Sequence, residues 1–347
     1  MGRLFSRLFF RDDCASGSNI WRQNQMTAFE CSLGPLSAFT DDLTWSLSLR
    51  FRSPFNRRSP NDLLNYLSPR HPSQSNVNDE LGVATEDIYE DMLQRQGDFV
   101  GPQIYNAEAH YLPYRRYLVD WMSDVGEQNH LHNSTIHVAI LFMDKIFANP
   151  EVKRDQWQLL ATACITVAAK YEEAEEHCPI IPDLLKMTKL AGEGSKNNIT
   201  SLAFRDGEVE VLEHLNWTLR AIPALHVVGY YLSKGAVFVD DTWQGRDLIE
   251  KIPRYVKKYA DFFCNLTMQE YSFQKYLPSQ LAAAILMASR EALSVAPRWR
   301  PEMTALTGYE ESEISPIFDH VWKYYAEQFP DRQDPRSISP RGVNQAV

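Results

Sequence analysis

From residue 86 onward, apolar side chains recur every three or four positions, which is the spacing of helices that bury one face. The segment 133–147 shows this pattern, and we expect Asn133 or Ser134 to cap its start. A second stripe runs through 157–171 and would bury Tyr171 at its end. No stretch shows the convincing alternation of apolar and polar residues that marks a half-buried strand. The pattern predicts an all-α fold.

Two of the helical segments repeat each other. "ATACITVAAK" (161–170) aligns without a gap on "LAAAILMASR" (281–290), at an offset of 120 residues. Small residues on every side of both segments would let neighbouring helices approach closely all round, as the central helix of a compact bundle requires. The repeat therefore predicts a duplicated unit of about five helices, with a boundary near Pro223.

The beginning of the chain differs from the rest. Residues 1–85 contain no lysine, are rich in serine, and carry prolines that interrupt any long periodicity, as in "SPFNRRSPNDLLNYLSPRHPSQSNVNDE". Such a composition favours disorder. We expect a disordered arm over 1–85, two helical domains over 86–222 and 223–330, and a flexible tail over 331–347.

The charge balance argues against nucleic acid as a partner. The net charge is -10 and the pI is near 5.4, whereas phosphate contacts need a basic footprint. The arm alone has a net charge of +1, so the acidity belongs to the helical part. No run approaches the ~20 apolar residues that span a bilayer. We expect a protein of the nucleus or the cytoplasm that binds neither nucleic acid nor membrane.

Candidate chemistry is sparse. The five cysteines include no CxxC pair, which predicts reduced thiols and neither a disulfide framework nor a zinc site. His130, His132 and His137 lie close in sequence, but no cysteine or carboxylate stands at ligand spacing. Neither a phosphate-cradling glycine loop nor a recognisable Ser/His/Asp order occurs. We expect no metal, no cofactor and no active site.

Several segments of the helical part resemble those of a known protein family. "YRRYLVDWMSDVGEQNHLHNSTIHVAILFMDKIF" looks like the opening of a cyclin box, "LLATACITVAAKYEE" like its central helix, and "VLEHLNWTLRAIPALHVVGYYL" like its exit into a second box. "KKYADFFCNLTMQEYSFQKYLPSQLAAAILMASR" extends the similarity, and details such as "MQEYSF" look most like J-type cyclins. The resemblance covers roughly residues 86–330. It implies two tandem five-helix cyclin boxes behind the arm.

The resemblance also implies a partner, a cyclin-dependent serine/threonine kinase. In the family, a lysine closing the central helix and a glutamate on the last helix of the first box contact the kinase together, and the matching residues are Lys170 and Glu208. A cation can bind exposed carbonyl oxygens, while a carboxylate can bind amide hydrogens of a docked segment. Without the resemblance, the two would be read as an ordinary surface pair worth ~0–1 kcal/mol. The implied role is that of an activating regulatory subunit in cell-cycle control.

Two further features follow from the same likeness. Arg115 and Asp144 match an internal ion pair that ties the first helix of the box to the second, and Asp120 is interpreted as similar in kind. In many cyclins the first helix also exposes an apolar groove for Arg-x-Leu-type peptides of substrates and inhibitors. Here tyrosines replace aliphatic residues and Arg116 adds positive charge, so we expect an altered or weakened groove, and peptide binding stays open. The matching groove residues are Tyr114, Tyr117, Leu118, Trp121, Asp124 and Gln158.

Two other functions stay as alternatives. A transcription-related factor with the cyclin fold would touch DNA with basic faces, which the net charge of -11 over the helical part disfavours. A kinase-independent scaffold would keep the fold and lose the activation, and the retained Lys170 and Glu208 speak against it.

Overall fold

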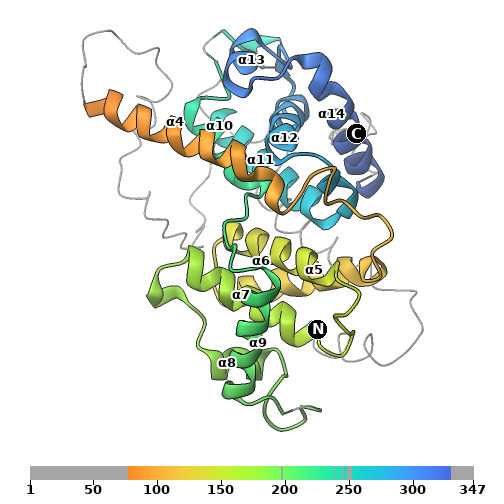
Figure 1. The fold of residues 1–347 in the computed structure, drawn as a ribbon. Helices are drawn as coiled ribbons and strands as arrows, with labels where there is room; N and C mark the ends of the chain where they lie inside the picture. Colours follow the sequence, from red (N-terminus) through yellow and green to blue (C-terminus); the bar gives the residue numbers. More distant parts are fainter. Residues whose placement is uncertain (1–76, 197, 239, 244, 248–251, 330–347) are drawn as a thin grey trace, which may run out of the picture. The chain divides into compact units, whose positions relative to one another are not determined.

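Helices make up most of the structure (Figure 1). The computed structural model describes residues 77–196, 198–238, 240–243, 245–247 and 252–329. The expected tail, and the expected arm up to residue 76, lie outside this part. Within it, the predicted all-α architecture is confirmed, with two successive groups of five helices.

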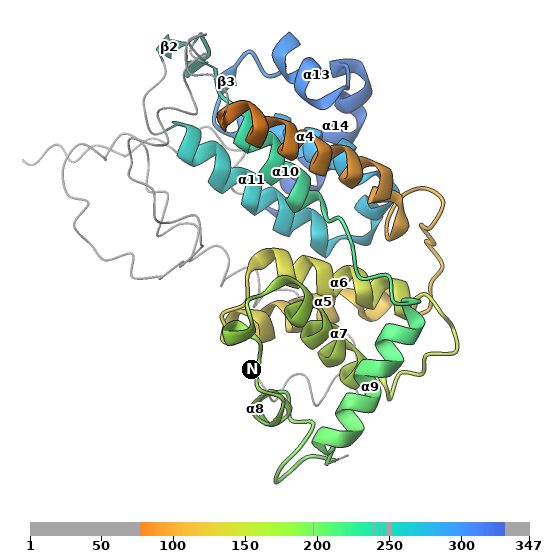
Figure 2. The same cartoon turned by 60° about the vertical axis from the view of Figure 1, so that its left-hand side comes forward.

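The first group is built around α7, a helix that lies between α6 and α9 (Figure 2). Residues 160–169 of α7 are buried without interruption, because small side chains there allow neighbours to approach on several sides. The helices are α5 (Leu112–Gln128), α6 (Asn133–Phe147), α7 (Trp157–Glu172), α8 (Ile181–Met187) and α9 (Ser201–His214), with a 3-10 turn η3 (Glu175–His177).

The second group has the same plan around α12. Residues 281–290 of α12 are all buried, and α12 packs against α10, α11 and α14. The two segments that repeat each other in the sequence therefore form the central helices of the two groups. The helices are α10 (Ala224–Lys234), α11 (Ile252–Gln269), α12 (Pro278–Ala292), α13 (Pro301–Thr307) and α14 (Glu311–Gln328), with a 3-10 turn η4 (Tyr271–Lys275).

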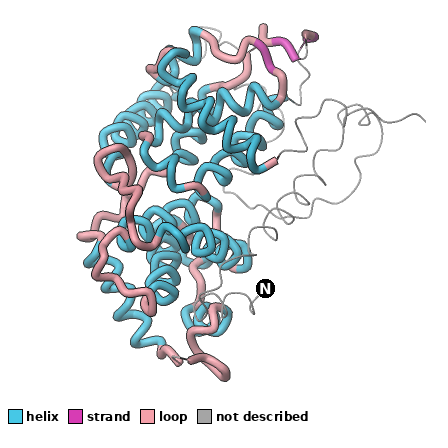
Figure 3. Tube along the Cα trace, turned by 90° about the vertical axis from the view of Figure 1, so that its right-hand side faces the viewer, coloured by secondary structure: helices cyan, strands magenta, loops and turns pink. Residues whose placement is uncertain are grey.

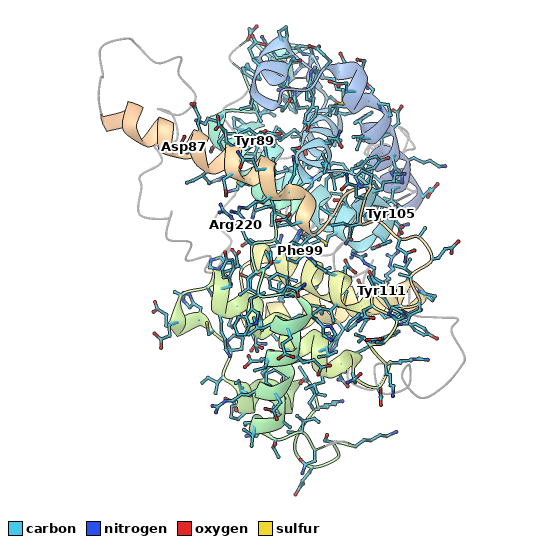
Figure 4. All side chains as sticks on the ribbon, in the orientation of Figure 1. Asp87, Tyr89, Phe99, Tyr105, Tyr111 and Arg220 are labelled. Atoms are coloured by element: carbon cyan, nitrogen blue, oxygen red, sulfur yellow. The ribbon has the colours of Figure 1, made fainter. Side chains whose placement is uncertain are left out.

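A helix precedes the first group. α4 (Val77–Arg95) and the 3-10 turn η2 (Gln96–Asp98) lead into it, so residues 77–85 are helical although they fall in the range predicted for the arm. α4 is held by contacts distant in sequence, which local composition does not reveal. The hydroxyl oxygen of Tyr89 lies 2.9 Å from that of Tyr231, and Arg220 pairs with Asp91 (Figure 4).

A small antiparallel sheet was missed in the sequence. Strands are magenta in Figure 3. The order of the sheet is β2-β1-β3, and each strand has two residues, too few for any alternation to show. The strands are β1 (Thr242–Trp243), β2 (Arg246–Asp247) and β3 (Val295–Ala296).

Two local predictions about the first group were wrong. α6 has no cap from Asn133 or Ser134; the carboxylate of Glu173 accepts the backbone N–H of His132 at 2.6 Å instead. Tyr171 is 48% exposed, because α7 ends one residue later and its last turn leaves the core.

Candidate functional site

Lys170 and Glu208 form an ion pair between α7 and α9. Lys170 stands in the last turn of α7, and Glu208 lies near the middle of α9. The Nζ of Lys170 is 2.6 Å and 2.7 Å from the two carboxylate oxygens of Glu208. The lysine side chain is 53% exposed and the glutamate side chain 9%. The structure thus brings the two predicted residues together, with the cation facing solvent and its counter-ion largely buried beneath it.

Both residues of the pair line an open groove of about 460 Å³. Tyr171 is 48% exposed, Val209 46% and Trp217 67%. Exposed apolar side chains gathered around a few charged groups are typical of surfaces that bind another protein. The lining residues are Val167, Lys170, Tyr171, Arg205, Glu208, Val209, Leu212, Trp217 and Leu219.

The apolar wall of this groove was not found by reading the sequence. The buried stripe of α9 includes Phe204 and Val211, and Leu215 continues it past the end of the helix. Val209 and Leu212 fall outside that stripe. Apolar residues on a second side of the helix could have indicated an exposed apolar surface there. Trp217 gave no comparable signal, because its outward position depends on the turn after α9, where its own φ is 58°.

Arg115 and Asp144 form the core of a buried polar cluster. Arg115 Nε lies 2.8 Å from Asp144 Oδ1, and Arg115 Nη2 lies 2.8 Å from Oδ2. Their side chains are 2% and 4% exposed. The same carboxylate accepts hydrogen bonds from the Tyr111 hydroxyl at 2.9 Å and from the Gln274 side chain. Burial, followed by the nearby Asp144 charge, raises the pKa of Tyr111, so its hydroxyl stays a donor.

The cluster also joins the two helical groups. Arg115 donates to the carbonyl oxygens of Met268 at 3.0 Å and Gln269 at 2.9 Å, which are at the C-terminal end of α11. A guanidinium suits this position because the last carbonyls of a helix have no partner within it and carry partial negative charge. Sequence reasoning had connected Arg115 only with the second helix of its own group.

The six residues predicted for a peptide groove lie on or beside α5 in different environments. Leu118 is 1% exposed and belongs to the core, whereas the other five are partly exposed. The Tyr114 hydroxyl accepts from Arg154 Nη1 at 3.2 Å, and the Arg154 guanidinium lies 4.2 Å from the Tyr114 ring centre. Gln158 donates to the carbonyl of Thr188 at 2.8 Å. Burial raises the pKa of Asp124.

Two charged residues of α5, Arg116 and Asp120, contact the second helical group. The guanidinium of Arg116 lies 3.5 Å from the Tyr324 hydroxyl and 3.5 Å from the side-chain oxygen of Gln328, both on α14. Asp120 accepts a hydrogen bond from the side-chain amide of Gln269 at 3.4 Å. Burial raises the pKa of Asp120 to about 7.

The histidines found close together in the sequence have separate roles. The side chain of His132 contacts Glu173, and His137 bonds to Asn265 at 2.8 Å. Burial lowers the pKa of His137 to about 4, so it is neutral at physiological pH. Across the described residues, no group of three or more His, Cys, Asp or Glu side chains could hold a metal ion. No helix in that part is long and apolar enough to cross a bilayer.

Comparison with known proteins matches each helical group to a domain family, with α10 lying between the two matched ranges. Residues 87–220 match the family "Cyclin, N-terminal domain", and residues 248–338 match "Cyclin, C-terminal domain". Cyclin-D of Ostreococcus tauri is 28% identical over 70% of this chain, and Cyclin-J of Xenopus laevis is 29% identical over 62%. The chain spans 64% and 56% of the lengths of those two proteins. The resemblance to J-type cyclins is thus supported, although the sequence identity to the D-type cyclin is nearly the same.

A solved structure agrees on the fold. The structure of a viral cyclin from herpesvirus saimiri has a TM-score of 0.52 to this chain, covering 71% of it and 97% of the viral protein, at 15% sequence identity. The two matched domain families together account for more than half of the residues and occur in the order that tandem cyclin boxes require. This chain belongs to the cyclin family.

Proposed function

We propose that the chain is a regulatory subunit that binds and activates a cyclin-dependent serine/threonine kinase in cell-cycle control, in the nucleus or the cytoplasm. One observation carries the proposal: the Lys170–Glu208 pair lines an open groove together with exposed apolar side chains. We call this surface the α7–α9 face, defined by the nine groove-lining residues given above.

The α7–α9 face has the composition of a protein-binding surface. Trp217 and Tyr171 supply large rigid contact areas, and Val209 and Leu212 add aliphatic surface suited to the apolar side of a partner helix. Lys170 has three donor hydrogens, of which Glu208 occupies part, so the exposed ammonium can also bind a partner's carbonyl oxygens. Apolar contact would supply affinity, and the two charges would fix the partner's orientation.

Activation by such a face is a shift between states of the partner. A protein that binds only the active arrangement of a kinase enriches that arrangement by its differential affinity, and needs no chemistry of its own. A shift from 1:99 to 99:1 requires about 5.5 kcal/mol of differential binding. The described groove is large enough to bury several apolar side chains, each worth roughly 1.5–3 kcal/mol.

The second part of the proposal concerns the α5 surface, where we place a modified site for substrate or inhibitor peptides. Tyr117, Trp121 and Asp124 are partly exposed and would offer an aromatic and acidic surface to a basic peptide. Tyr114 already contacts Arg154, so a peptide arginine would compete with this internal cation. We expect weak binding of Arg-x-Leu peptides in fluorescence polarisation, strengthened by Arg154→Ala.

Affinity purification of the full chain tests the main proposal. A kinase should be recovered and identified, and it should phosphorylate a peptide substrate faster with the chain than alone. Lys170→Glu and Glu208→Lys should each abolish recovery. The double swap, Lys170→Glu with Glu208→Lys, keeps an ion pair but exchanges the positions of the positive and negative charges. The variant should therefore fold and still not bind.

Matched controls lie on the same helical group. Lys186, whose side chain is 70% exposed on α8, and Glu213, exposed on α9, can be reversed in charge without touching the groove. These controls should bind normally. A scaffold would keep its partners after the reversals at Lys170 and Glu208 and leave kinase activity unchanged, and that result would refute the proposal.

A further inference from the structure

Glu173 follows the last residue of α7 and is bonded to a different helix. Its carboxylate accepts three hydrogen bonds from the start of α6: the backbone N–H of His132 at 2.6 Å, the Nδ1 of His132 at 2.5 Å and the hydroxyl of Thr135 at 2.7 Å. The Glu173 side chain is 0% exposed. No side chain of α6 itself caps this end. Glu173 therefore accepts the backbone N–H of the N-cap residue, the bond that a carboxylate inside the helix makes in a capping box.

This carboxylate is well suited to hold two helix ends together. The first N–H groups of α6 have no partner within the helix and carry partial positive charge, which a carboxylate neutralises. Burial alone would raise the pKa of Glu173, but the hydrogen bonds from Thr135 and His132 outweigh it and lower the pKa. The backbone N–H of Glu173 also closes the last turn of α7, bonding to Ala169 at 2.9 Å. The start of α6 and the end of α7 are thus joined through one residue.

The turn that Glu173 closes carries two residues of the α7–α9 face. Lys170 and Tyr171 precede Glu173 by three and two positions, and about half of each side chain is exposed. The last turn of a helix frays readily unless outside contacts hold it. Here the direct bonds of the Glu173 carboxylate to the well-buried helix α6 provide such a contact.

We propose that Glu173 is a positioning residue for the α7–α9 face: its bonds to His132 and Thr135 hold the last turn of α7 in place and so orient Lys170 and Tyr171 toward a partner. The inference rests on the proposed function. If the last turn of α7 were flexible, it would have to become ordered on binding, and the conformational entropy lost would reduce the affinity. The acidic run "YEEAEEHC" thereby contains one residue with a defined task among others that are exposed.

The test compares Glu173→Ala with Glu175→Ala and Glu176→Ala. All three remove one negative charge from the same run, but Glu175 and Glu176 are exposed on η3 and cap no helix. Binding is measured with whichever purified cyclin-dependent kinase from a panel binds the unmodified full chain most tightly. Glu173→Ala should weaken binding about tenfold, as the loss of charge-assisted hydrogen bonds predicts. Glu173→Gln, which keeps one acceptor oxygen, should recover most of the affinity, and the controls should bind normally.

Hydrogen exchange separates positioning from general loss of stability. Glu173→Ala should speed exchange in peptides covering 168–173 and at the start of α6, with little change in α12. A core variant in the second group, Ile285→Val, can serve as a comparison that lowers the melting temperature without touching this turn. Unchanged affinity or unchanged exchange at 168–173 in Glu173→Ala would overturn the inference. If Lys170→Glu leaves binding intact, the proposed function fails; if Lys170→Glu abolishes binding and Glu173→Ala does not alter it, only this inference fails.

Discussion

Removing the Asp144 carboxylate should destabilise the fold strongly. Asp144→Ala would take away both bonds to Arg115 and the acceptor for Tyr111 and Gln274, all of them buried. Breaking a buried ion pair by deleting one partner typically costs 3–5 kcal/mol, roughly, because the other charge stays buried without compensation. For a folded region of this size, that corresponds to a fall in melting temperature of about 10 °C.

The structure also predicts which other helix should lose stability in Asp144→Ala. Arg115 binds the last carbonyls of α11, so displacement of its guanidinium should loosen that helix end as well as α5. Differential scanning calorimetry measures the loss, and hydrogen exchange should show faster exchange at residues 265–275. The double variant Arg115→Met with Asp144→Leu removes both charges and should be more stable than Asp144→Ala alone, because no unpaired charge is then buried. A loss under about 1 kcal/mol for Asp144→Ala, with α11 unaffected, would refute this reasoning.

Two further predictions concern α5. The pKa of Asp120 is raised to about 7 from 3.8, so folding disfavours its ionised form, and its contribution to stability should fall as pH rises from about 4 to about 7. Asp120→Asn should remove this fall of the unfolding free energy with pH and stabilise the chain at pH 8 by on the order of 1–3 kcal/mol. Urea unfolding at several pH values measures the effect, and an unchanged pH dependence would contradict the burial argument. Gly126→Ala should cost about 1–3 kcal/mol, since its Cβ would lie 2.0 Å from Cδ1 of Ile136. Adding Ile136→Ala should lessen that cost in a double-mutant cycle, and strict additivity of the two losses would argue against the clash.

Much of the helical architecture could be predicted from local pattern alone. The recurrence of apolar residues marked the segments that became α6 and α7, because one buried face per helix leaves a period that any single sequence displays. The repeat between 161–170 and 281–290 marked the two central helices, since only small side chains permit close packing on several sides. Lys170 and Glu208 were found through the likeness of the surrounding segments to cyclins.

The features missed by the sequence depend on contacts between distant residues. The bond from the His132 N–H to the Glu173 carboxylate joins positions 41 residues apart, and Arg115 reaches carbonyls more than 150 residues away. No periodicity encodes such bonds, because each partner is compatible with many local structures. The exposure of Trp217 is likewise set by the turn after α9 and not by its own residue type.

The sequence by itself thus indicated an all-α fold and its two central helices, and its likeness to cyclins indicated which lysine and glutamate to examine. Only the tertiary structure decided that these two charges meet in the lining of an open groove, and that the carboxylate of Glu173, at the end of α7, bonds to the start of α6. The physical reason is the sequence separation of the interacting residues. Helix periodicity arises from neighbours three or four positions apart, whereas a surface groove is assembled by packing elements far apart in the chain.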